Sequence, residues 1–349
     1  MFLFFVVLLV VNSVKSELND TCTTSVYRSG SCVPVIDCQY VLNIIRSEDH
    51  TSEDWSFIDH NKCGEIPGKP PRPLVCCPII QNVDGCGISR IGQRIYGGEE
   101  TGIGVYPWAG LIEYRTHRGK FEMSCGCALV HYRWVVTAAH CIVGIPRRLT
   151  VHGVRFNEWD TGKKSNCTII NDVKLCRAIY EVEGQFSHPS YSMYDPNMRH
   201  DIALLKTRTH VEINDYVIPI CLPFSESIQE LRIENENFIV TGWGQTDKDT
   251  PGKQRHVSLI GKNRTICDIA FRQQMIELSY DQLCIGGEAG QDSCRGDSGG
   301  PLMYESGLIT YVVGVVSFGA LNCGTENHPG VYTKVADYLD WIEDIMINN

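Results

Sequence analysis

The sequence contains no internal repeat and no low-complexity tract, and beyond its first residues it has no apolar run long enough to cross a membrane. These absences exclude a repeat architecture and a membrane-spanning chain. Basic residues are in the minority, since 31 Lys and Arg stand against 41 Asp and Glu, for a formal net charge of −10 at pH 7. Because such a chain repels polyanions, we expect no nucleic-acid partner.

The first 16 residues also lack arginine, which disfavours a mitochondrial targeting segment. They begin with MFLFFVVLLVV, an apolar run too short to span a membrane, and end in VKS before the polar Glu17. Residues 1–16 are therefore predicted to be a cleaved signal peptide. We expect the mature protein to be secreted and extracellular.

Cysteine, in contrast, is abundant: the chain has 17, which fits an oxidising compartment. Six of them fall within residues 22–77, a segment too small to bury a sufficient apolar core, so disulfides are expected to stabilise it. Secretion and the absence of CxxC pairs disfavour the alternative of a zinc site. Spacing alone leaves fifteen pairings open. The six are Cys22, Cys32, Cys38, Cys63, Cys76 and Cys77.

The segment DSCRGDSGGP at residues 292–301 places Ser298 between small residues, where a substrate carbonyl group can approach it. The backbone N–H groups of Gly296 and Ser298 are candidates for an oxyanion hole. A serine nucleophile also needs a base and a group that orients the base. The motif VVTAAHC supplies His140 and the motif DIALL supplies Asp201. Each motif alone has an ordinary structural interpretation, as a turn or a packed core residue.

Together, in the chain order His, Asp, Ser, these motifs resemble the trypsin and chymotrypsin family from Ile95 to the C-terminus. The resemblance implies a hydrolase, a serine endopeptidase with Ser298 as nucleophile and His140 as general base and then general acid. Asp201 would hold the imidazole tautomer and stabilise the imidazolium. The implied fold is all-β, a trypsin-like double antiparallel β-barrel with a C-terminal helix, and the catalytic residues lie between the barrels.

Local patterns support this fold independently. The runs ALVHYRWVVTA, FIVTGW and YVVGVVSF are short, β-branched and aromatic, and turn residues bound them, which is typical of strands. Near the C-terminus, Val335, Leu339, Ile342 and either Ile345 or Met346 recur at helical spacing. We therefore expect a closing amphipathic helix.

The same resemblance implies substrate specificity. Asp292, six residues before Ser298, matches the floor of the primary specificity pocket, and a carboxylate there favours a cation. The walls match Ser317, Phe318 and Gly319 in one segment and Gly330 in another. Glycine at both wall positions leaves room for a long side chain. Protein substrates should carry Arg or Lys before the scissile bond.

The segment QRIYGG at residues 93–98 resembles the activation site of the family, with cleavage between Arg94 and Ile95. The new Ile95 ammonium group would pair with Asp297 and order the oxyanion loop and the pocket. The alternative is a surface loop with a chance arginine. Because the cleavage follows Arg, an upstream trypsin-like protease is the expected activator.

The six cysteines of residues 22–77, which end in a Cys-Cys pair, resemble the small arthropod clip domain that precedes such proteases. Residues 78–94 then form a linker with the activation site, and residues 95–349 form the protease domain. One cysteine, Cys127, is left over by the odd count and is expected to be free or intermolecular. The resemblance implies the pairs Cys22–Cys76, Cys32–Cys63, Cys38–Cys77, Cys86–Cys221, Cys125–Cys141, Cys167–Cys176, Cys267–Cys284 and Cys294–Cys323.

The resemblance places the protein in an extracellular proteolytic cascade of innate immunity, in melanisation or Toll-type signalling, or makes it a venom component. A serpin inhibitor is a further implied partner. The alternative is a non-catalytic clip-domain homologue that acts as a binding cofactor. Such homologues typically lack the catalytic serine, and this chain retains Ser298.

Two kinds of accessory site remain as predictions. Asn19, Asn166 and Asn263 lie in N-x-S/T sequons and are candidate glycosylation sites. No cofactor is required, but Glu158 and Asp160 in NEWDT offer the hard oxygen ligands of a structural calcium site. The neighbouring Lys163 and Lys164 favour a solvated acidic loop instead, and both interpretations stay open at this point.

Overall fold

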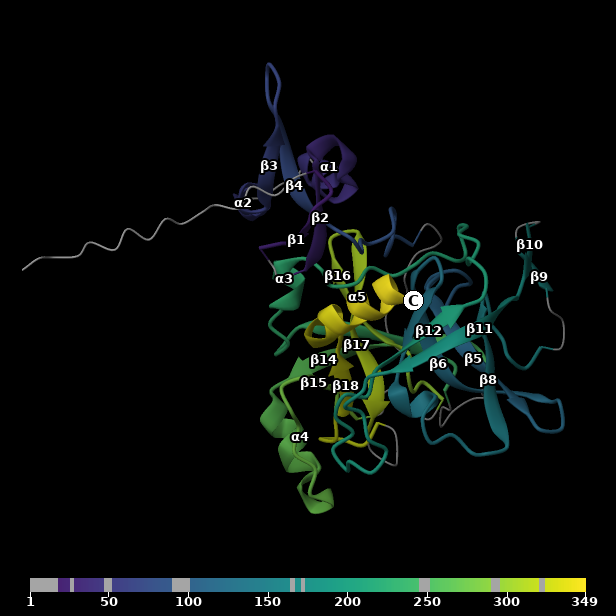
Figure 1. Ribbon diagram of the computed structural model, residues 1–349. Helices are drawn as coiled ribbons and strands as arrows, with labels where there is room; N and C mark the ends of the chain where they lie inside the picture. Colours follow the sequence, from purple (N-terminus) through teal and green to yellow (C-terminus); the bar gives the residue numbers. More distant parts are fainter. Residues whose placement is uncertain are drawn as a thin grey trace, which may run out of the picture. The chain divides into compact units, whose positions relative to one another are not determined.

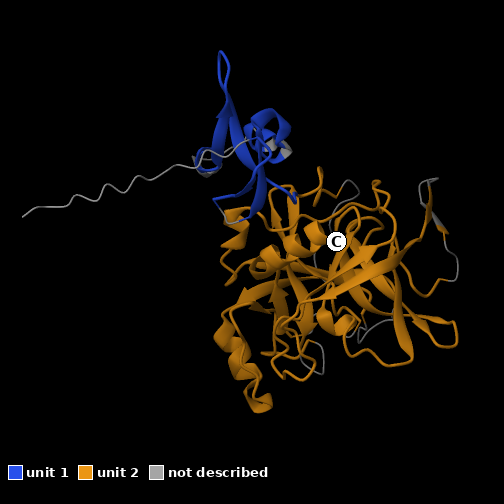
Figure 2. Ribbon diagram, in the orientation of Figure 1, with its two compact units in different colours: residues 1–81 blue, residues 82–349 orange. Residues whose placement is uncertain are grey.

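The computed structural model describes residues 18–25, 28–46, 52–89, 101–163, 167–170, 173–244, 252–289, 296–319 and 324–349. The chain divides into two compact units, residues 1–81 and residues 82–349 (Figure 2). Among the described residues, no helix combines the length and the apolar character that a membrane crossing requires.

Unit 1, residues 1–81, contains a four-stranded antiparallel sheet in the order β1-β2-β4-β3 (Figure 1). Three disulfides cross-link it, Cys22–Cys76, Cys32–Cys63 and Cys38–Cys77. Gly30 is required beside the first of these, because a Cβ there would lie 2.6 Å from Cys76 Sγ. The elements are β1 (Thr21–Thr23), β2 (Ser29–Pro34), η1 (Val35–Asp37), α1 (Gln39–Arg46), α2 (Ser52–His60), β3 (Lys62–Ile66) and β4 (Arg72–Pro78).

In the described part of unit 2, residues 82–349, two antiparallel sheets of six strands each close into barrels. Figure 1 shows the first barrel in blue and teal and the second in green and yellow. The all-β, double-barrel prediction is confirmed. The first barrel is β5 (Ala109–Thr116), β6 (Phe121–His131), β7 (Trp134–Thr137), β8 (Leu149–Phe156), β11 (Ala178–Ser187) and β12 (Ala203–Thr207). The second barrel is β13 (Asn237–Gly242), β14 (Arg255–Lys262), β15 (Gln282–Ile285), β16 (Pro301–Ser306), β17 (Ile309–Phe318) and β18 (Gly330–Lys334).

Short helices and one hairpin complete the described part of unit 2. The hairpin of β9 (Cys167–Ile170) and β10 (Val173–Cys176) is closed by the disulfide Cys167–Cys176. The closing helix is a 3-10 turn, η4 (Val335–Tyr338), followed by α5 (Leu339–Asn348). Of the two alternatives for its last apolar position, Met346 is buried, whereas Ile345 is only half-buried. The remaining elements are η2 (Ala139–Cys141), α3 (Glu226–Gln229), α4 (Arg264–Ala270) and η3 (Arg272–Gln274).

The strand patterns explain the barrels. The segment YVVGVVSF lies in β17 and FIVTG in β13, and both carry β-branched and aromatic residues that pack on a pleated surface. In the second barrel, Phe238, Leu259, Ile285 and Leu302 form part of one apolar cluster and are completely buried. Burial of a side chain of this size stabilises the fold by about 1.5–3 kcal/mol.

The first residues of unit 2, which precede the predicted activation site, are anchored to later segments of the same unit. Asn82 Nδ2 donates to the carbonyl oxygen of Leu222 (2.9 Å), and the Leu222 N–H donates back to Asn82 Oδ1 (2.8 Å). The disulfide Cys86–Cys221 lies next to this pair. Gly87 has a φ of +66°, and a Cβ there would lie 2.3 Å from the Thr310 carbonyl oxygen. Both covalent and hydrogen bonds therefore hold residues 82–87.

Candidate active site

His140 lies in η2, just after β7, where the chain leaves the first barrel. The disulfide Cys125–Cys141 ties η2 to β6, and Thr137 Oγ1 donates to the carbonyl oxygen of Gly126 on the same strand (2.9 Å). The His140 side chain is 23% exposed. The imidazole is thus fixed at its base and still open to a ligand.

Asp201 precedes β12 and is completely buried. Its Oδ1 accepts from the His140 N–H (2.9 Å), and its Oδ2 accepts from His140 Nδ1 (2.8 Å) and from Ser317 Oγ (2.6 Å). Three donors compensate the buried carboxylate for the loss of water. Because a carboxylate only accepts, the proton lies on His140 Nδ1, and Nε2 presents its lone pair.

Ser317 therefore contacts the buried carboxylate of Asp201 as well as standing at a predicted pocket wall. The sequence pattern assigned only the pocket position to this residue. The bond joins residues 116 positions apart, so no local motif indicates it. A second bond of this kind runs from Thr333 Oγ1 on β18 to the Asp201 carbonyl oxygen (2.9 Å).

Ser298 lies in the loop between β15 and β16, and this loop packs against β6 and β7 of the first barrel. The Ser298 carbonyl oxygen accepts from the Gly126 N–H (2.8 Å) and lies 3.7 Å from Cys141 Sγ, beside His140. Gly299 has a φ of +78°, and a Cβ there would lie 2.2 Å from Thr137 Oγ1. Glycine thus permits the close approach of the Ser298 loop to Thr137 and to Cys141, the residue after His140.

Gly296 and Asp297 precede Ser298 in this loop. Gly296 has a φ of +106°, a conformation that residues with side chains rarely adopt. The buried Asp297 carboxylate accepts from the Gly244 N–H (2.8 Å). A Cβ at Gly242 would lie 1.9 Å from Asp297 Oδ1, so glycine at this position admits the carboxylate. The predicted partner Ile95 and the cleavage residue Arg94 lie outside the described residues.

The predicted pocket is described in part. Ser317 and Gly319 lie at the end of β17, and Gly330 begins β18, which pairs with β17 through Phe318 and Val331. Phe318 packs edge-on against Phe271 with ring centroids 5.6 Å apart. The pocket floor Asp292 and the predicted pair Cys294–Cys323 lie outside the described residues.

The predicted calcium ligands do not fit a metal site. The Glu158 side chain is only 2% exposed, and its Oε2 accepts from Arg177 Nε (2.7 Å) and Arg155 Nη1 (3.2 Å). Asp160 Oδ1 accepts from the Gly162 N–H (3.0 Å). Two guanidinium groups therefore provide the positive charge that a calcium ion would bring. These contacts favour the interpretation without a metal ion over a calcium site.

Two of the three predicted glycosylation sites lie among the described residues. Asn263 is exposed and caps α4, where its Oδ1 accepts from the Thr265 N–H (3.1 Å), and Asn19 is exposed with a φ of +69°. The Asn166 sequon lies outside the described residues.

Cys127 is a free, fully buried thiol on β6, and burial raises its pKa, which disfavours the intermolecular alternative.

Disulfide pairing in the described residues coincides with seven of the eight pairs that the resemblance implies, including Cys267–Cys284. Cys125, His140 and Cys141 also lie close enough for a metal site, but the two sulfurs are bonded to each other and offer no thiolate. The group is therefore not a metal centre.

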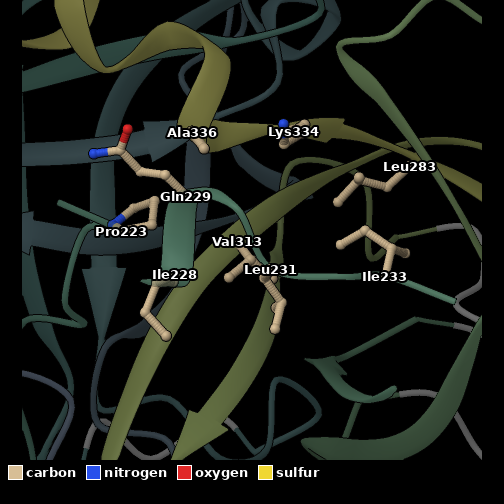
Figure 3. Close-up of a pocket in the computed structure, with 9 residues that line it drawn as sticks. All are labelled: Pro223, Ile228, Gln229, Leu231, Ile233, Leu283, Val313, Lys334 and Ala336. Carbon is tan, nitrogen blue, oxygen red and sulfur yellow. The ribbon is translucent and has the colours of Figure 1, made fainter. Parts of the chain in front are cut away.

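A small apolar pocket lies elsewhere on the second barrel (Figure 3). None of its lining residues belongs to the candidate site, and its one charged group, Lys334, pairs with Asp337 (2.7 Å). The pocket is lined by Pro223, Ile228, Gln229, Leu231, Ile233, Leu283, Val313, Lys334 and Ala336.

Comparisons with known proteins agree with this geometry. Residues 95–342 match the trypsin family, and residues 22–77 match the regulatory CLIP domain of proteinases. The chain is 46% identical to CLIP domain-containing serine protease B15 of Anopheles gambiae over 340 residues, covering 96% of this chain and 93% of that protein. It is 32% identical to phenoloxidase-activating factor 3 of Holotrichia diomphalia, covering 98% and 99%. The crystal structure of the Drosophila Grass clip serine protease of the Toll pathway superposes with a TM-score of 0.65 at 29% identity, covering 95% and 99%.

Proposed function

The chain belongs to the clip-domain serine proteases of the trypsin family, and from this premise we propose that it is a secreted zymogen. Cleavage after Arg94 activates it, and the active enzyme hydrolyses protein substrates after Arg or Lys. The observation that carries the catalytic assignment is the buried Asp201 carboxylate, which accepts from His140 Nδ1 (2.8 Å) and leaves Nε2 as the base.

Catalysis follows from these positions. His140 Nε2 takes the proton of Ser298 Oγ as this oxygen attacks the substrate carbonyl carbon, and the oxyanion accepts from the N–H groups of Gly296 and Ser298. His140 then gives the proton to the leaving amine, and an acyl-enzyme remains. Water, activated by the same imidazole, hydrolyses the ester and regenerates Ser298. Asp201 stays ionised and stabilises the imidazolium in both steps.

Specificity rests on Asp292 at the pocket floor. A carboxylate in a narrow pocket prefers a guanidinium or ammonium partner, since an unpaired buried charge is costly. Gly330 at the described wall is buried and leaves space for a long side chain. We therefore assign Arg or Lys to the residue before the scissile bond.

Activation couples the new Ile95 ammonium group to Asp297. The Asp297 carboxylate lies in a space that glycine at positions 242 and 244 keeps open, directly beside the oxyanion loop. A positive charge delivered there orders the loop that carries Gly296 and Ser298. After cleavage, the disulfide Cys86–Cys221 and the paired hydrogen bonds of Asn82 keep the two chains together.

The biological setting is an extracellular proteolytic cascade. The predicted signal peptide, residues 1–16, and the cross-linked clip domain support secretion. The relatives named for phenoloxidase activation and for the Toll pathway support a role in melanisation or Toll-type signalling. An upstream trypsin-like protease would be the activator and a serpin the inhibitor, and glycans at Asn19 and Asn263 would be compatible with their exposed positions.

The experiment compares hydrolysis of a short Arg amide before and after controlled cleavage at Arg94–Ile95. We expect activity only after cleavage, a preference for Arg and Lys over Phe, and no activity in the matched variants Arg94→Gln and Ser298→Ala. Silence of the wild-type chain after verified cleavage would indicate the non-catalytic binding cofactor instead.

A further inference from the structure

Asp201 lies at the centre of a three-residue turn that His200 and Ile202 close. The His200 carbonyl oxygen accepts from the Ile202 N–H (2.8 Å), and His200 itself has a φ of +58°. Residues with side chains adopt this left-handed conformation rarely and at a cost of about 1–2 kcal/mol. The direction of the Asp201 side chain therefore depends on contacts that hold His200 in place.

The His200 ring joins a chain of hydrogen bonds that runs to two distant segments. His200 Nδ1 lies 2.9 Å from Tyr338 Oη in η4, and the Tyr338 hydroxyl donates to Asp281 Oδ2, just before β15. A phenol has one proton, and Tyr338 gives it to the carboxylate, so His200 Nδ1–H must be the donor to Tyr338. The hydrogen bonds are therefore donated from His200 to Tyr338 and from Tyr338 to Asp281.

Asp281 and Tyr338 keep their protonation states. Burial would raise the pKa of Asp281, but hydrogen bonds from Ser279 and Tyr338 lower it below its usual value. Burial and the Asp281 carboxylate raise the pKa of Tyr338. The Asp281 carbonyl oxygen also accepts from the Lys334 N–H (2.8 Å), which connects it to β18. The acceptor thus stays ionised, the phenol stays protonated, and the anchor is rigid.

One face of the His200 ring is packed as well. His188 stacks on it with ring centroids 5.1 Å apart and an interplanar angle of 23°. The His188 N–H donates to the Ile202 carbonyl oxygen (3.0 Å), and its ring packs edge-on against Trp341 of α5. His188 therefore contacts the turn twice, through its ring and through its backbone N–H.

We propose that His200 is a positioning residue for Asp201, held by the hydrogen bonds that run through Tyr338 to Asp281 and by the stacked ring of His188. The inference rests on the proposed function, in which Asp201 orients the catalytic base. The inference adds residues that hold the turn containing Asp201, whereas Ser317 and Thr333 bind Asp201 itself.

The test measures kcat and KM of the cleaved enzyme on the Arg amide. His200→Ala is expected to lower kcat about 10-fold, short of the roughly 100-fold that a misplacement of one ångström can cost, with KM within about 2-fold of wild type. His200→Asn should restore kcat, because Asn tolerates a positive φ and its Nδ2 can donate to Tyr338. Tyr338→Phe should lower kcat as His200→Ala does, and the double variant should lose little more.

A second readout does not need turnover. The proton on His140 Nδ1 reports its bond to Asp201, and its NMR resonance should shift or broaden in His200→Ala and return in His200→Asn. Asn235→Ala is the matched control, because Asn235 has a φ of +68° in the turn before β13. This variant should lose stability and keep both kcat and the His140 resonance.

The outcomes separate the two hypotheses. A wild-type chain that is silent after cleavage contradicts the proposed function, while the NMR comparison still decides the role of His200. The inference is overturned if His200→Ala keeps both kcat and the resonance. It is also overturned if Asn fails to restore them and their loss merely follows a drop in melting temperature.

Discussion

Units 1 and 2 are stabilised in different ways. The apolar cluster of unit 1 has five buried members, two of which are the disulfide-bonded Cys38 and Cys77. The second barrel of unit 2 has a cluster of ten buried members without cysteine. Unit 1 thus relies on covalent links where unit 2 relies on packing, as expected for a segment of its small size.

The lengths of the disulfide loops sharpen this contrast. The three bonds of unit 1 join residues 54, 31 and 39 positions apart. In unit 2, Cys86–Cys221 joins residues 135 positions apart, but Cys125–Cys141, Cys167–Cys176 and Cys267–Cys284 join residues only 16, 9 and 17 positions apart. Because closing a longer loop removes more entropy from the unfolded chain, the bonds of unit 1 contribute more than these three short bonds. The short bonds of unit 2 instead fix local geometry, such as the position of His140.

The largest expected effect comes from Asp201→Asn, which tests whether unit 1 is independent of unit 2. The neutral amide cannot stabilise an imidazolium, and its NH₂ group can donate to His140 Nδ1 and favour the wrong tautomer, so kcat should fall about 10⁴-fold, as in triads of this type. The melting of unit 1 should not change. Active-site titration and rapid kinetics on the cleaved enzyme measure the first effect, and hydrogen exchange of unit 1 measures the second. A change in unit 1 would show that the two units are not independent.

Removing one disulfide of unit 1 tests the same independence by a change in the other unit. Cys32→Ser with Cys63→Ser should cost about 2–5 kcal/mol and unfold unit 1, while the cleaved enzyme keeps its activity on a small amide. Limited proteolysis and amidase assays read the two units separately. Cys167→Ser with Cys176→Ser is the matched control, because it opens a loop of only 9 positions. Equal losses from both pairs would contradict the argument from loop length.

The sequence was sufficient for features that reside in local patterns. The three motifs, the β-branched strands and the cysteine spacing led to the family and the barrels. It was insufficient where distant segments meet. The bond from Ser317 to Asp201 spans 116 positions, and the contact of His200 with Tyr338 spans 138. The acidic residues near position 158 suggested calcium, because nothing local shows that Arg177 folds back onto Glu158.

The Glu158 cluster provides a smaller test within unit 2. Glu158→Gln removes the charge that pairs with Arg155 and Arg177 and should cost about 2 kcal/mol, since hydrogen bonds between charged groups contribute about 1.5–3. A chelator should leave the melting temperature of the wild-type protein unchanged. Glu181→Gln is the control, because its pair with Arg208 is exposed. Chelator-sensitive melting would restore the calcium interpretation.

The smallest expected effect is a pH dependence confined to unit 2. Burial lowers the pKa of His131, with a further contribution from His210, and burial and the neighbouring His200 lower the pKa of His188. The unfolded chain, with a histidine pKa near 6.5, then binds more protons than the folded one below that pH. Stability of unit 2 should therefore fall as the pH drops from about 6.5 through the lowered folded-state pKa values, and then level off.

Unfolding of unit 2 in denaturant at pH 7.5 and pH 5.5 measures this slope, and the change in melting temperature should be no more than a few degrees. His188→Gln should flatten part of the slope, because it removes one of the two titrating groups. His60, the described histidine of unit 1, is exposed, and hydrogen exchange in unit 1 serves as the comparison. A parallel slope in both units would mean that the titration acts through the net charge of the whole chain. In that case, half-buried histidines would not distinguish the packed unit from the cross-linked one.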